Sequence, residues 1–553
     1  MAPGALESEG VSGCGGDPAL SAPQGMRLPQ APFRSPALAA LDAVARALLA
    51  PGSWALNRLL DLRPTTAERR RRRPCAWCRG CAARAVAGPV LAVLLLLSLP
   101  LTALGLLLWL PLQAARSPFL YQHTAAAPAE PWDLRQPRTF TFVSANLCLL
   151  PSGLAKFSNL GQTPQRAADI ARRLVPAPPD PGSDRAGLVE PRHRGANGYG
   201  GTLSTERGVA LEMPEVEAPL TEPEPPMAEP EPPVREPEPP VTEPEPPLTE
   251  PEPPLTEPEP PLSERFPPAA DVLCLQEVFD GAAAACLRRR LGRVFPHVIS
   301  EVGTGGLRRG RLRLLGSGLF LASRFPVLAA AFRSFPNGAR EDAMADKGLL
   351  MVQVQLGSAR HRRIVGYVGC THLQAPAGDG AVRDAQLTLA LRWLQRFQQE
   401  QERSGDLVAF DVLCGDLNFD NCSRGDQLNQ RHRLFELYQD PCRQGPGQDE
   451  PWAIGTLLNY LEIYEEPVST PEKMKRTLSS PGGRCRFLAG PILASGLPDA
   501  SFPAPCRGRR LDYAVFRAAA AADVAAVSFI TRLATCSDHL PVALSLHVGP
   551  GAP

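Results

Sequence analysis

The chain has 553 residues and a formal net charge of +1, from 58 Lys and Arg against 57 Asp and Glu. A charge this close to zero lacks the overall positive field of a nucleic-acid-binding protein, which counts against a nuclease. The 62 prolines and 47 glycines are more than one packed domain uses, so the folded part must be shorter than the chain.

The N-terminal part of the chain predicts attachment to a membrane. Residues 1–36 are rich in Gly, Pro and Ser, show no signal-peptide pattern and are predicted to be disordered. Ala85 to Ala115 is uncharged and dominated by Leu, and roughly 20 apolar residues span a bilayer. Pro100 and Pro111 leave open a single kinked crossing or a hairpin that returns to the same side. A buried core helix is the alternative, although only the helix-like Leu38 to Leu62 is available to cover it.

A basic loop with three cysteines separates these two apolar segments. Arg69 to Arg73 are five adjacent arginines, which attract anionic phospholipid headgroups by about 1 kcal/mol per residue. The positive-inside rule places the loop on the cytosolic side. Cys75, Cys78 and Cys81 follow, and no second pair of Cys or His stands at zinc-site spacing. We therefore predict reversible S-acylation of these cysteines, with unmodified thiols as the alternative.

Residues 221–262 repeat the unit Thr-Glu-Pro-Glu-Pro-Pro with small variations. Three prolines in each unit forbid a coiled coil, so the segment is predicted to be an extended, acidic polyproline II spacer. Docking of proline-recognition domains is the alternative function. Strand-like residues lie on both sides of the repeat, which indicates that it interrupts a folded domain.

In the rest of the chain, apolar, β-branched segments are each followed by polar side chains, a pattern typical of buried strands that deliver polar groups to one cleft. Helical stretches such as Ala381 to Gln399 lie between them, which predicts an α+β fold with two β-sheets packed face to face under helices. The polar residues are Asn146, Gln276-Glu277, Thr371-His372, Asp416, Asn418, Asp512 and Ser537-Asp538-His539. Acids, an amide and an imidazole in this order suit a metal-assisted phosphodiesterase.

These motifs resemble those of the DNase-I-like endonuclease/exonuclease/phosphatase superfamily, which implies a four-layer α/β sandwich. The stretches Asn146 to Pro151 and Pro451 to Thr456, with the apolar N-terminus, narrow the resemblance to the membrane-bound neutral sphingomyelinases of animals, especially their mitochondria-associated branch. The implied organisation is a disordered N-terminus (1–36), a hydrophobic membrane-associated region (37–120), a first part of the catalytic domain (138–176), a disordered insertion (177–263) and the remainder of the catalytic domain (264–548).

The resemblance implies hydrolysis of sphingomyelin in membranes to ceramide and phosphocholine, with Mg²⁺ as cofactor and Mn²⁺ as a substitute. Glu277 and Asn146 supply oxygen ligands of the hard kind that Mg²⁺ prefers. Asp538 is expected near the metal. A choline headgroup also suits an aromatic face, but the sequence does not say which one.

The catalytic roles that the resemblance implies fall on five residues. His539 is the general base that takes a proton from the attacking water, because an unperturbed imidazole is largely neutral near pH 7. Asp512 orients His539, and Asp416 positions or activates the water. Asn418 and His372 donate hydrogen bonds to the phosphate oxygens.

Structural roles remain open for several of these residues when each is taken alone. His372 suits a structural histidine, and Asp512 suits an ion pair with Arg509 or Arg510. Arg324 is equally suited to a place near the phosphate and to a structural ion pair.

Asp342 and Lys347 match an Asp and a Lys that act as a regulatory switch in the resembled group. The chain departs from that group at two positions. The first is Asp346, a second carboxylate that competes for the Lys347 ammonium. The second is the loop Gly303 to Arg311, which is rich in Gly and Arg where a close relative has cysteines expected to be acylated. The loop therefore lacks acylation sites for membrane attachment, and contact of its basic residues with anionic lipid is the expected substitute. A solvated charged loop is the alternative for the Asp–Lys pair.

Two other functions stay open at this stage. The core residues do not name the leaving group, so a nuclease or an inositol-phosphate phosphatase of the same superfamily is possible, although the membrane segment and near-zero charge disfavour nucleic acid as a partner. A membrane scaffold with a vestigial site is the other. The predicted location is an intracellular membrane, with the mitochondrial or endoplasmic-reticulum membrane preferred to the Golgi or plasma membrane. Arg27, Arg34 and Arg46 faintly resemble a mitochondrial address.

Overall fold

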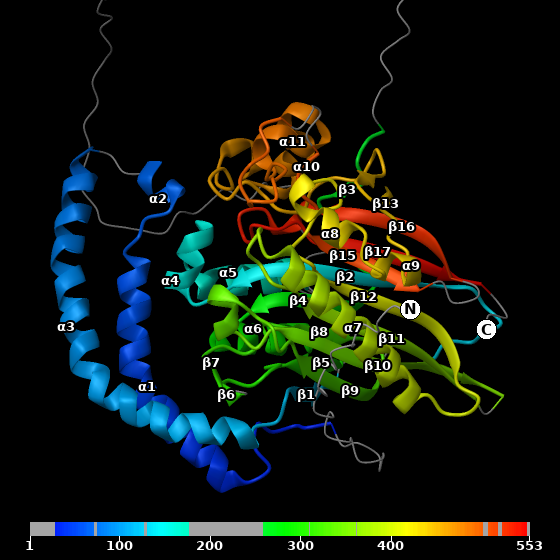
Figure 1. Ribbon diagram of the computed structural model, residues 1–553, viewed down its shortest axis with the longest axis horizontal. Coiled ribbons are helices and arrows are strands. Elements are labelled where there is room, and N and C mark those ends of the chain that lie inside the picture. Colours follow the sequence, from blue (N-terminus) through cyan, green and yellow to red (C-terminus); the bar gives the residue numbers. More distant parts are fainter. Residues whose placement is uncertain are drawn as a thin grey trace, which may run out of the picture. The chain divides into compact units, whose positions relative to one another are not determined.

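The computed structural model describes residues 28–70, 74–125, 130–175, 258–308, 310–360, 362–501, 507–517 and 522–549, without the side chains of 74–83 and 308 (Figure 1). The Thr-Glu-Pro-Glu-Pro-Pro repeat and most of the predicted N-terminal and inserted disordered segments lie outside these residues. Residues 28–36 and 258–263, which the sequence analysis assigned to those segments, are described. Leu262 and Ser263 form a short strand, because they pair with the strand that ends at Ile530.

The N-terminal region is helical. It consists of α1 (Pro36–Asp61), α2 (Thr66–Arg70), α3 (Pro74–Leu112) and the 3₁₀ turn η1 (Gln113–Ala115). The stretch Arg84–Ala115 is long and apolar enough to cross a membrane, and only 11% of its most apolar part is buried. This exposure contradicts the alternative of a buried core helix. Helix α3 continues through Pro100, so no hairpin forms at that proline.

Two β-sheets form the centre of the folded domain. The larger has the strand order β1-β5-β8-β4-β2-β17-β16-β3, and the smaller has the order β15-β12-β11-β10-β9. The strands of the larger sheet are β1 (Leu120–His123), β2 (Arg138–Leu149), β3 (Leu262–Ser263), β4 (Ala270–Val278), β5 (His297–Ser300), β8 (Phe320–Ser323), β16 (Ala522–Ile530) and β17 (Val542–Val548). Those of the smaller are β9 (Val327–Ser334), β10 (Gly348–Ala359), β11 (Arg362–His372), β12 (Leu407–Asp416) and β15 (Asp512–Arg517).

The remaining elements surround these sheets. Two hairpins are formed by β6 (Gly306–Arg308) with β7 (Arg311–Arg313) and by β13 (Arg443–Gly445) with β14 (Gln448–Asp449). The helices are α4 (Ser152–Ala155), α5 (Thr163–Leu174), α6 (Gly281–Leu291), α7 (Gly380–Gln401), α8 (Gln427–Gln430), α9 (Leu434–Leu437), α10 (Pro471–Ser479) and α11 (Pro481–Phe487). The 3₁₀ turns are η2 (Lys156–Ser158), η4 (Arg340–Met344), η5 (Arg424–Asp426), η6 (Glu466–Val468) and η7 (Thr531–Leu533).

The hydrophobic core is arranged in layers. Between the sheets, the ring of Phe410 lies 5.2 Å from that of Phe140 and 4.8 Å from that of Phe142. Helices α5 and α6 pack on the outer face of the larger sheet, and α7 packs on the outer face of the smaller one (Figure 1). The order helix, sheet, sheet, helix confirms the predicted α+β sandwich. Four cysteines on the strands of these sheets, Cys148, Cys274, Cys370 and Cys414, are buried and free.

Candidate active site

Strand pairing brings the predicted polar residues to one end of the sandwich. In the larger sheet β2 and β4 are parallel, with Asn146 opposite Gln276 and Glu277 next along β4. In the smaller sheet β11 and β12 are parallel, with His372 opposite Asp416. Because carboxyl ends of parallel strands meet at one sheet edge, residues far apart in the chain become neighbours. Asn146 lies within β2 rather than after it, since that strand continues to Leu149.

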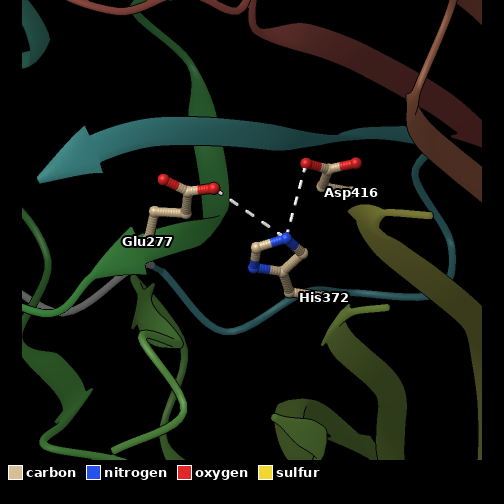
Figure 2. A group of neighbouring side chains, drawn as sticks. All are labelled: Glu277, His372 and Asp416. Atoms are coloured by element: carbon tan, nitrogen blue, oxygen red, sulfur yellow. Dashed lines mark ion pairs between the residues drawn. The ribbon is translucent and has the colours of Figure 1, made fainter. Parts of the chain in front are cut away.

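Three side chains from β4, β11 and β12 converge in the cleft between the sheets. Figure 2 shows the His372 ring between Glu277 and Asp416; its Nε2 lies 3.9 Å from a Glu277 carboxylate oxygen and 3.7 Å from one of Asp416. The ligand atoms of the three residues lie within 4.8 Å of one another, a spacing that can hold a metal ion. Glu277 has φ +58°, an uncommon conformation for a residue with a Cβ. Such backbone strain is concentrated at functional sites.

Asn146 connects the two carboxylates as a hydrogen-bond donor. Its Nδ2 donates to Glu277 at 3.0 Å and to Asp416 at 2.9 Å, while its Oδ1 accepts from the backbone N–H of Cys148 at 3.0 Å. The amide therefore presents its nitrogen to the carboxylates, whereas the predicted role as a metal ligand requires its oxygen. A half-turn of the amide, at the expense of the Cys148 bond, would present that oxygen.

His539 forms a second, adjacent constellation with two carboxylates. Its Nδ1 lies 2.7 Å from Oδ2 of Asp512, and its Nε2 lies 4.0 Å from Oδ2 of Asp416. The short bond fixes the ring with Nε2 directed to the cleft. Thr456 and Leu457 support the two partners. Oγ1 of Thr456 accepts from the backbone N–H of Asp512 at 3.1 Å, and Leu457 forms a backbone β-bridge with His539.

Burial and charge perturb the pKa values in this cleft. Burial, with the nearby Asp538 carboxylate, raises the pKa of Glu277 to about 7. Burial also raises the pKa of Asp416 to about 6. For His539, burial alone lowers the pKa, but the carboxylates around it, Asp512 foremost, outweigh burial and raise the pKa well above its ordinary value. Strong perturbation of several groups in one cleft marks a functional site.

The raised pKa of His539 differs from the expectation of an unperturbed imidazole. The negative charge of the surrounding carboxylates favours the protonated form of His539. The opposite holds for His372, because burial, with the Lys347 ammonium, lowers its pKa well below the ordinary value. The pKa values of the two histidines are therefore shifted in opposite directions.

Asn418 and Asp538 lie at the margins of the cleft. The backbone N–H of Asn418 donates to Asp416 at 2.9 Å, and its side-chain Nδ2 donates to the carbonyl oxygen of Leu373 at 3.1 Å. Its amide is thus already used, and the predicted bond to a phosphate oxygen requires it to turn. Asp538 has a buried Oδ1 that has no hydrogen-bond partner among the described residues. A buried carboxylate oxygen without a donor suits a cation.

Lys347 links the predicted regulatory pair to the cleft. Its Nζ donates to Asp342 at 2.9 Å and to the carbonyl oxygen of Leu373 at 2.9 Å, and it lies 3.0 Å from Nε2 of His372. An ammonium can only donate, so Nε2 of His372 accepts and its ring proton is on Nδ1. As placed, Nε2 of His372 is occupied by Lys347 and is not free for the predicted bond to phosphate.

Asp346 does not compete for the Lys347 ammonium. Its carboxylate is fully buried and forms an ion pair with Arg313, accepts from Ser334 at 2.5 Å and accepts from the backbone N–H of Thr304 at 2.8 Å. These three partners satisfy the Asp346 carboxylate on the side of the chain opposite the Lys347 side chain, because consecutive residues of an extended chain point to opposite faces. Lys347 is left to pair with Asp342.

Three arginines that the sequence offered for other roles have partners away from the cleft. Asp512 therefore does not pair with Arg509 or Arg510, and Arg324 does not approach the candidate site. The partners are Asp420 and Asp426 for Arg509, Asp440 and Asp449 for Arg510, and the carbonyl oxygen of Pro268 for Arg324.

Sequence reasoning missed Arg166 and gave no separate role to Ser537, and both residues connect the segments that carry the site. Arg166 on α5 is buried and donates to the carbonyl oxygens of Cys148 and Cys536, each at 2.7 Å. Ser537 donates to the carbonyl oxygen of Asn146 at 2.7 Å. These bonds join the loop before His539 to strand β2. The only signal in the sequence was that Arg166 stands on the apolar face of an amphipathic helix, and this pattern is too common to be specific.

The predicted acylation sites Cys75, Cys78 and Cys81 lie in the first turns of α3. Their side chains are outside the described part of the structure, so S-acylation stays a prediction.

The layered fold with a buried carboxylate and histidine cleft defines an enzyme of the endonuclease/exonuclease/phosphatase class. The model of the Endonuclease/Exonuclease/phosphatase family matches residues 260–539. A second model, described as the neutral sphingomyelinase N-terminal transmembrane region, matches residues 37–115.

Full-length relatives narrow the class. The chain is 37% identical over 551 residues to sphingomyelin phosphodiesterase 5 of Danio rerio, which covers 95% of this chain and 99% of the relative. It is 39% identical over 527 residues to sphingomyelin phosphodiesterase 5 of Mus musculus, with 94% of each chain covered. Sphingomyelin phosphodiesterase 3 of Homo sapiens is 34% identical over 645 residues, covering 94% of this chain and 98% of the relative. The chain belongs to the neutral sphingomyelinase family of phosphoric diester hydrolases.

Proposed function

We propose that the protein is a Mg²⁺-dependent sphingomyelin phosphodiesterase that acts at a membrane surface and releases ceramide and phosphocholine. The names of the relatives support the substrate, and the apolar helix α3 supports action at a membrane. The observation that carries the chemistry is the Asp512–His539 pair at 2.7 Å, with the free edge of His539 directed to the carboxylate cleft. This activity places the protein in sphingolipid metabolism and ceramide signalling.

The donor set of the cleft fits a divalent cation. Asp416 is a buried carboxylate and Glu277 a partly buried one, and burial raises the pKa of each, so a nearby cation would favour their ionised forms. Oδ1 of Asp538 has no hydrogen-bond partner among the described residues, and a hard cation with oxygen ligands suits such carboxylates. Mg²⁺ would be held by Glu277 with Asp538 and, after its amide turns, Asn146; Mn²⁺ would fit the same donors. When bound, the ion neutralises charge on the phosphoryl group and on the departing oxygen.

The residues of the chain then supply proton transfer and orientation. Nε2 of neutral His539 takes a proton from water as the water oxygen bonds to phosphorus, and the phosphorus–oxygen bond to ceramide breaks. The ceramide oxygen leaves with its electron pair and receives a proton, so one water is consumed for one ceramide and one phosphocholine. Asp512 holds the His539 ring and stabilises its protonated form, and Asp416 positions the water. Asn418 and His372, once their present partners release them, would donate to the phosphate oxygens.

We further propose that Lys347 keeps His372 neutral and so protects the cation site. In Lys347→Met the His372 ring, 3.9 Å from Glu277 and 3.7 Å from Asp416, loses its cationic neighbour and gains a proton more readily. A protonated His372 competes with Mg²⁺ for the two carboxylates. The half-saturating Mg²⁺ concentration is expected to rise about tenfold, the equivalent of one pKa unit. Lys347→Arg, which keeps the charge, is the control, and an unchanged Mg²⁺ requirement in the Met variant would refute this role.

The N-terminal region and the proline-rich repeat support proposals for location and for other partners. We propose an intracellular membrane, mitochondrial or endoplasmic-reticulum, with the basic loop of residues 69–73 against anionic phospholipid. Fractionation of cells that express the tagged full-length chain tests the membrane.

Proline-recognition partners of residues 221–262 are tested by capture on the isolated repeat peptide, and failure to bind any such domain removes that proposal.

A substrate panel tests the central proposal. The full-length protein in detergent micelles with Mg²⁺ is offered sphingomyelin, phosphatidylcholine, a phosphoinositide and abasic-site DNA in separate reactions. Release of phosphocholine from sphingomyelin, with little turnover of the others, is the expected result. Cleavage of DNA or of the phosphoinositide without hydrolysis of sphingomyelin would overturn the proposal in favour of another branch of the superfamily.

A further inference from the structure

The hairpin of β6 and β7 has its polar and apolar faces reversed relative to a hairpin in water. Successive side chains of a strand point to opposite faces. Arg313 is buried and forms the ion pair with Asp346, while Arg311 is exposed but donates back to the carbonyl oxygens of Pro336 and Gly338. The leucines between and after them are therefore directed outward.

These outward leucines form a continuous apolar face. Leu307 on β6 pairs directly across the hairpin with Leu312 on β7, and the two side chains are 64% and 43% exposed. Leu314, two residues beyond Leu312, lies on the same face and is 47% exposed. A hairpin that buries an arginine and exposes its leucines is unfavourable against water, so this face is expected to have an apolar partner.

The end of the membrane-spanning helix identifies that partner. A Cβ at Gly305 would overlap the Trp109 ring, and one at Gly306 would lie 2.7 Å from Cβ of Gln113. The hairpin thus begins in direct contact with the last turn of α3 and with η1 (Figure 1). Trp residues concentrate at the membrane–water interface. The leucine face is therefore continuous with the surface at which α3 leaves the bilayer.

We propose that the outer face of the β6–β7 hairpin, formed by Leu307, Leu312 and Leu314, inserts into the lipid bilayer and anchors the catalytic domain there. The anchor is apolar and non-covalent. It differs from the basic contact expected from the sequence, because Arg311 and Arg313 bond groups of the protein itself. The inference rests on the membrane span and not on the proposed chemistry.

Photocrosslinking tests the location of the hairpin without any use of catalysis. Benzoylphenylalanine replaces Leu307 in the full-length protein, reconstituted in phosphatidylcholine vesicles. The control site is Val524, which is 41% exposed on β16 and pairs with Leu546, toward the end of the sheet away from Asn146. Lipid adducts are expected at position 307 and at least tenfold fewer at 524. Equal labelling at both sites, or adducts of position 307 with protein alone, would overturn the proposal.

A paired substitution tests its consequence. Leu307→Glu with Leu312→Glu is expected to lower hydrolysis of vesicle sphingomyelin about tenfold, while hydrolysis of detergent-solubilised sphingomyelin stays within about twofold of wild type. Val524→Glu is the control and leaves both rates unchanged. Equal loss on both substrates would show a folding defect and contradict the role of an anchor. If neither substrate is hydrolysed even by wild type, the proposed function fails, and the crosslinking result still decides the anchor.

Discussion

His539→Ala is expected to lower kcat for sphingomyelin hydrolysis by about 10³- to 10⁴-fold, toward the upper end of what a general base contributes. The ring is the one imidazole in the described cleft whose free edge is not occupied by Lys347. Asp512→Asn keeps the shape of the partner but removes the charge that supports a protonated ring, so we expect a loss of about 10²-fold. Both are measured as phosphocholine release at saturating Mg²⁺ and substrate.

His432→Ala is the matched control for loss of a buried histidine. That ring is 8% exposed and bonds Thr388 and the backbone N–H of Leu434, away from the cleft. It should reduce thermal stability without a comparable loss of turnover. If His539→Ala retained more than about a tenth of wild-type turnover while melting normally, His539 would not be the general base.

The pattern of apolar strands followed by polar residues predicted much of the site because the fold places strand ends together. Glu277, His372 and Asp416 each lie at or near the end of a strand, and parallel pairing then aligns them. The two-sheet architecture follows from the same pattern, since strands buried on both faces require helices as cover. These features depend on local sequence and on general rules of packing.

Features that depend on distant residues could not be predicted in this way. The apolar stretch Val527 to Leu533 has the composition of one strand, yet β16 ends at Ile530 and a 3₁₀ turn follows. His539 is positioned instead by its backbone β-bridge to Leu457. Likewise, the choice of Asp346 between Lys347 and Arg313 is set by a hairpin more than thirty residues upstream. Sequence spacing does not reveal such a partner.

Protonation of these groups also depends on the assembled cleft. An isolated glutamate titrates near pH 4.3 and an isolated histidine near 6.5. In the cleft, burial raises the pKa of Glu277 to about 7, and the carboxylates raise that of His539 despite its burial. A cation among the carboxylates cancels part of their charge and thereby lowers the pKa of His539 toward the value that a base needs at pH 7.

Glu277→Gln is expected to lower kcat/KM at millimolar Mg²⁺ by about 10³-fold, because the several kcal/mol of charge stabilisation by a metal correspond to about three decades of rate. Glu301→Gln is the control: it also removes a glutamate charge, but that residue pairs with Arg116 and Arg288 outside the cleft. The substitution is measured on sphingomyelin micelles across a Mg²⁺ titration.

The same titration repeated at several pH values tests how Glu277 holds the ion. Its pKa of about 7 means that a proton occupies the carboxylate below pH 7 and must leave when the cation binds. The half-saturating Mg²⁺ concentration of wild type should therefore rise as pH falls below 7, by about tenfold per unit for one displaced proton. Asp416, with a pKa of about 6, steepens this rise at lower pH only if it also binds the ion. Glu277→Gln has no proton to displace at position 277, so its Mg²⁺ requirement should stay flat between pH 6.5 and 8; a wild-type requirement equally flat over pH 5.5 to 8 would exclude Glu277 as a ligand.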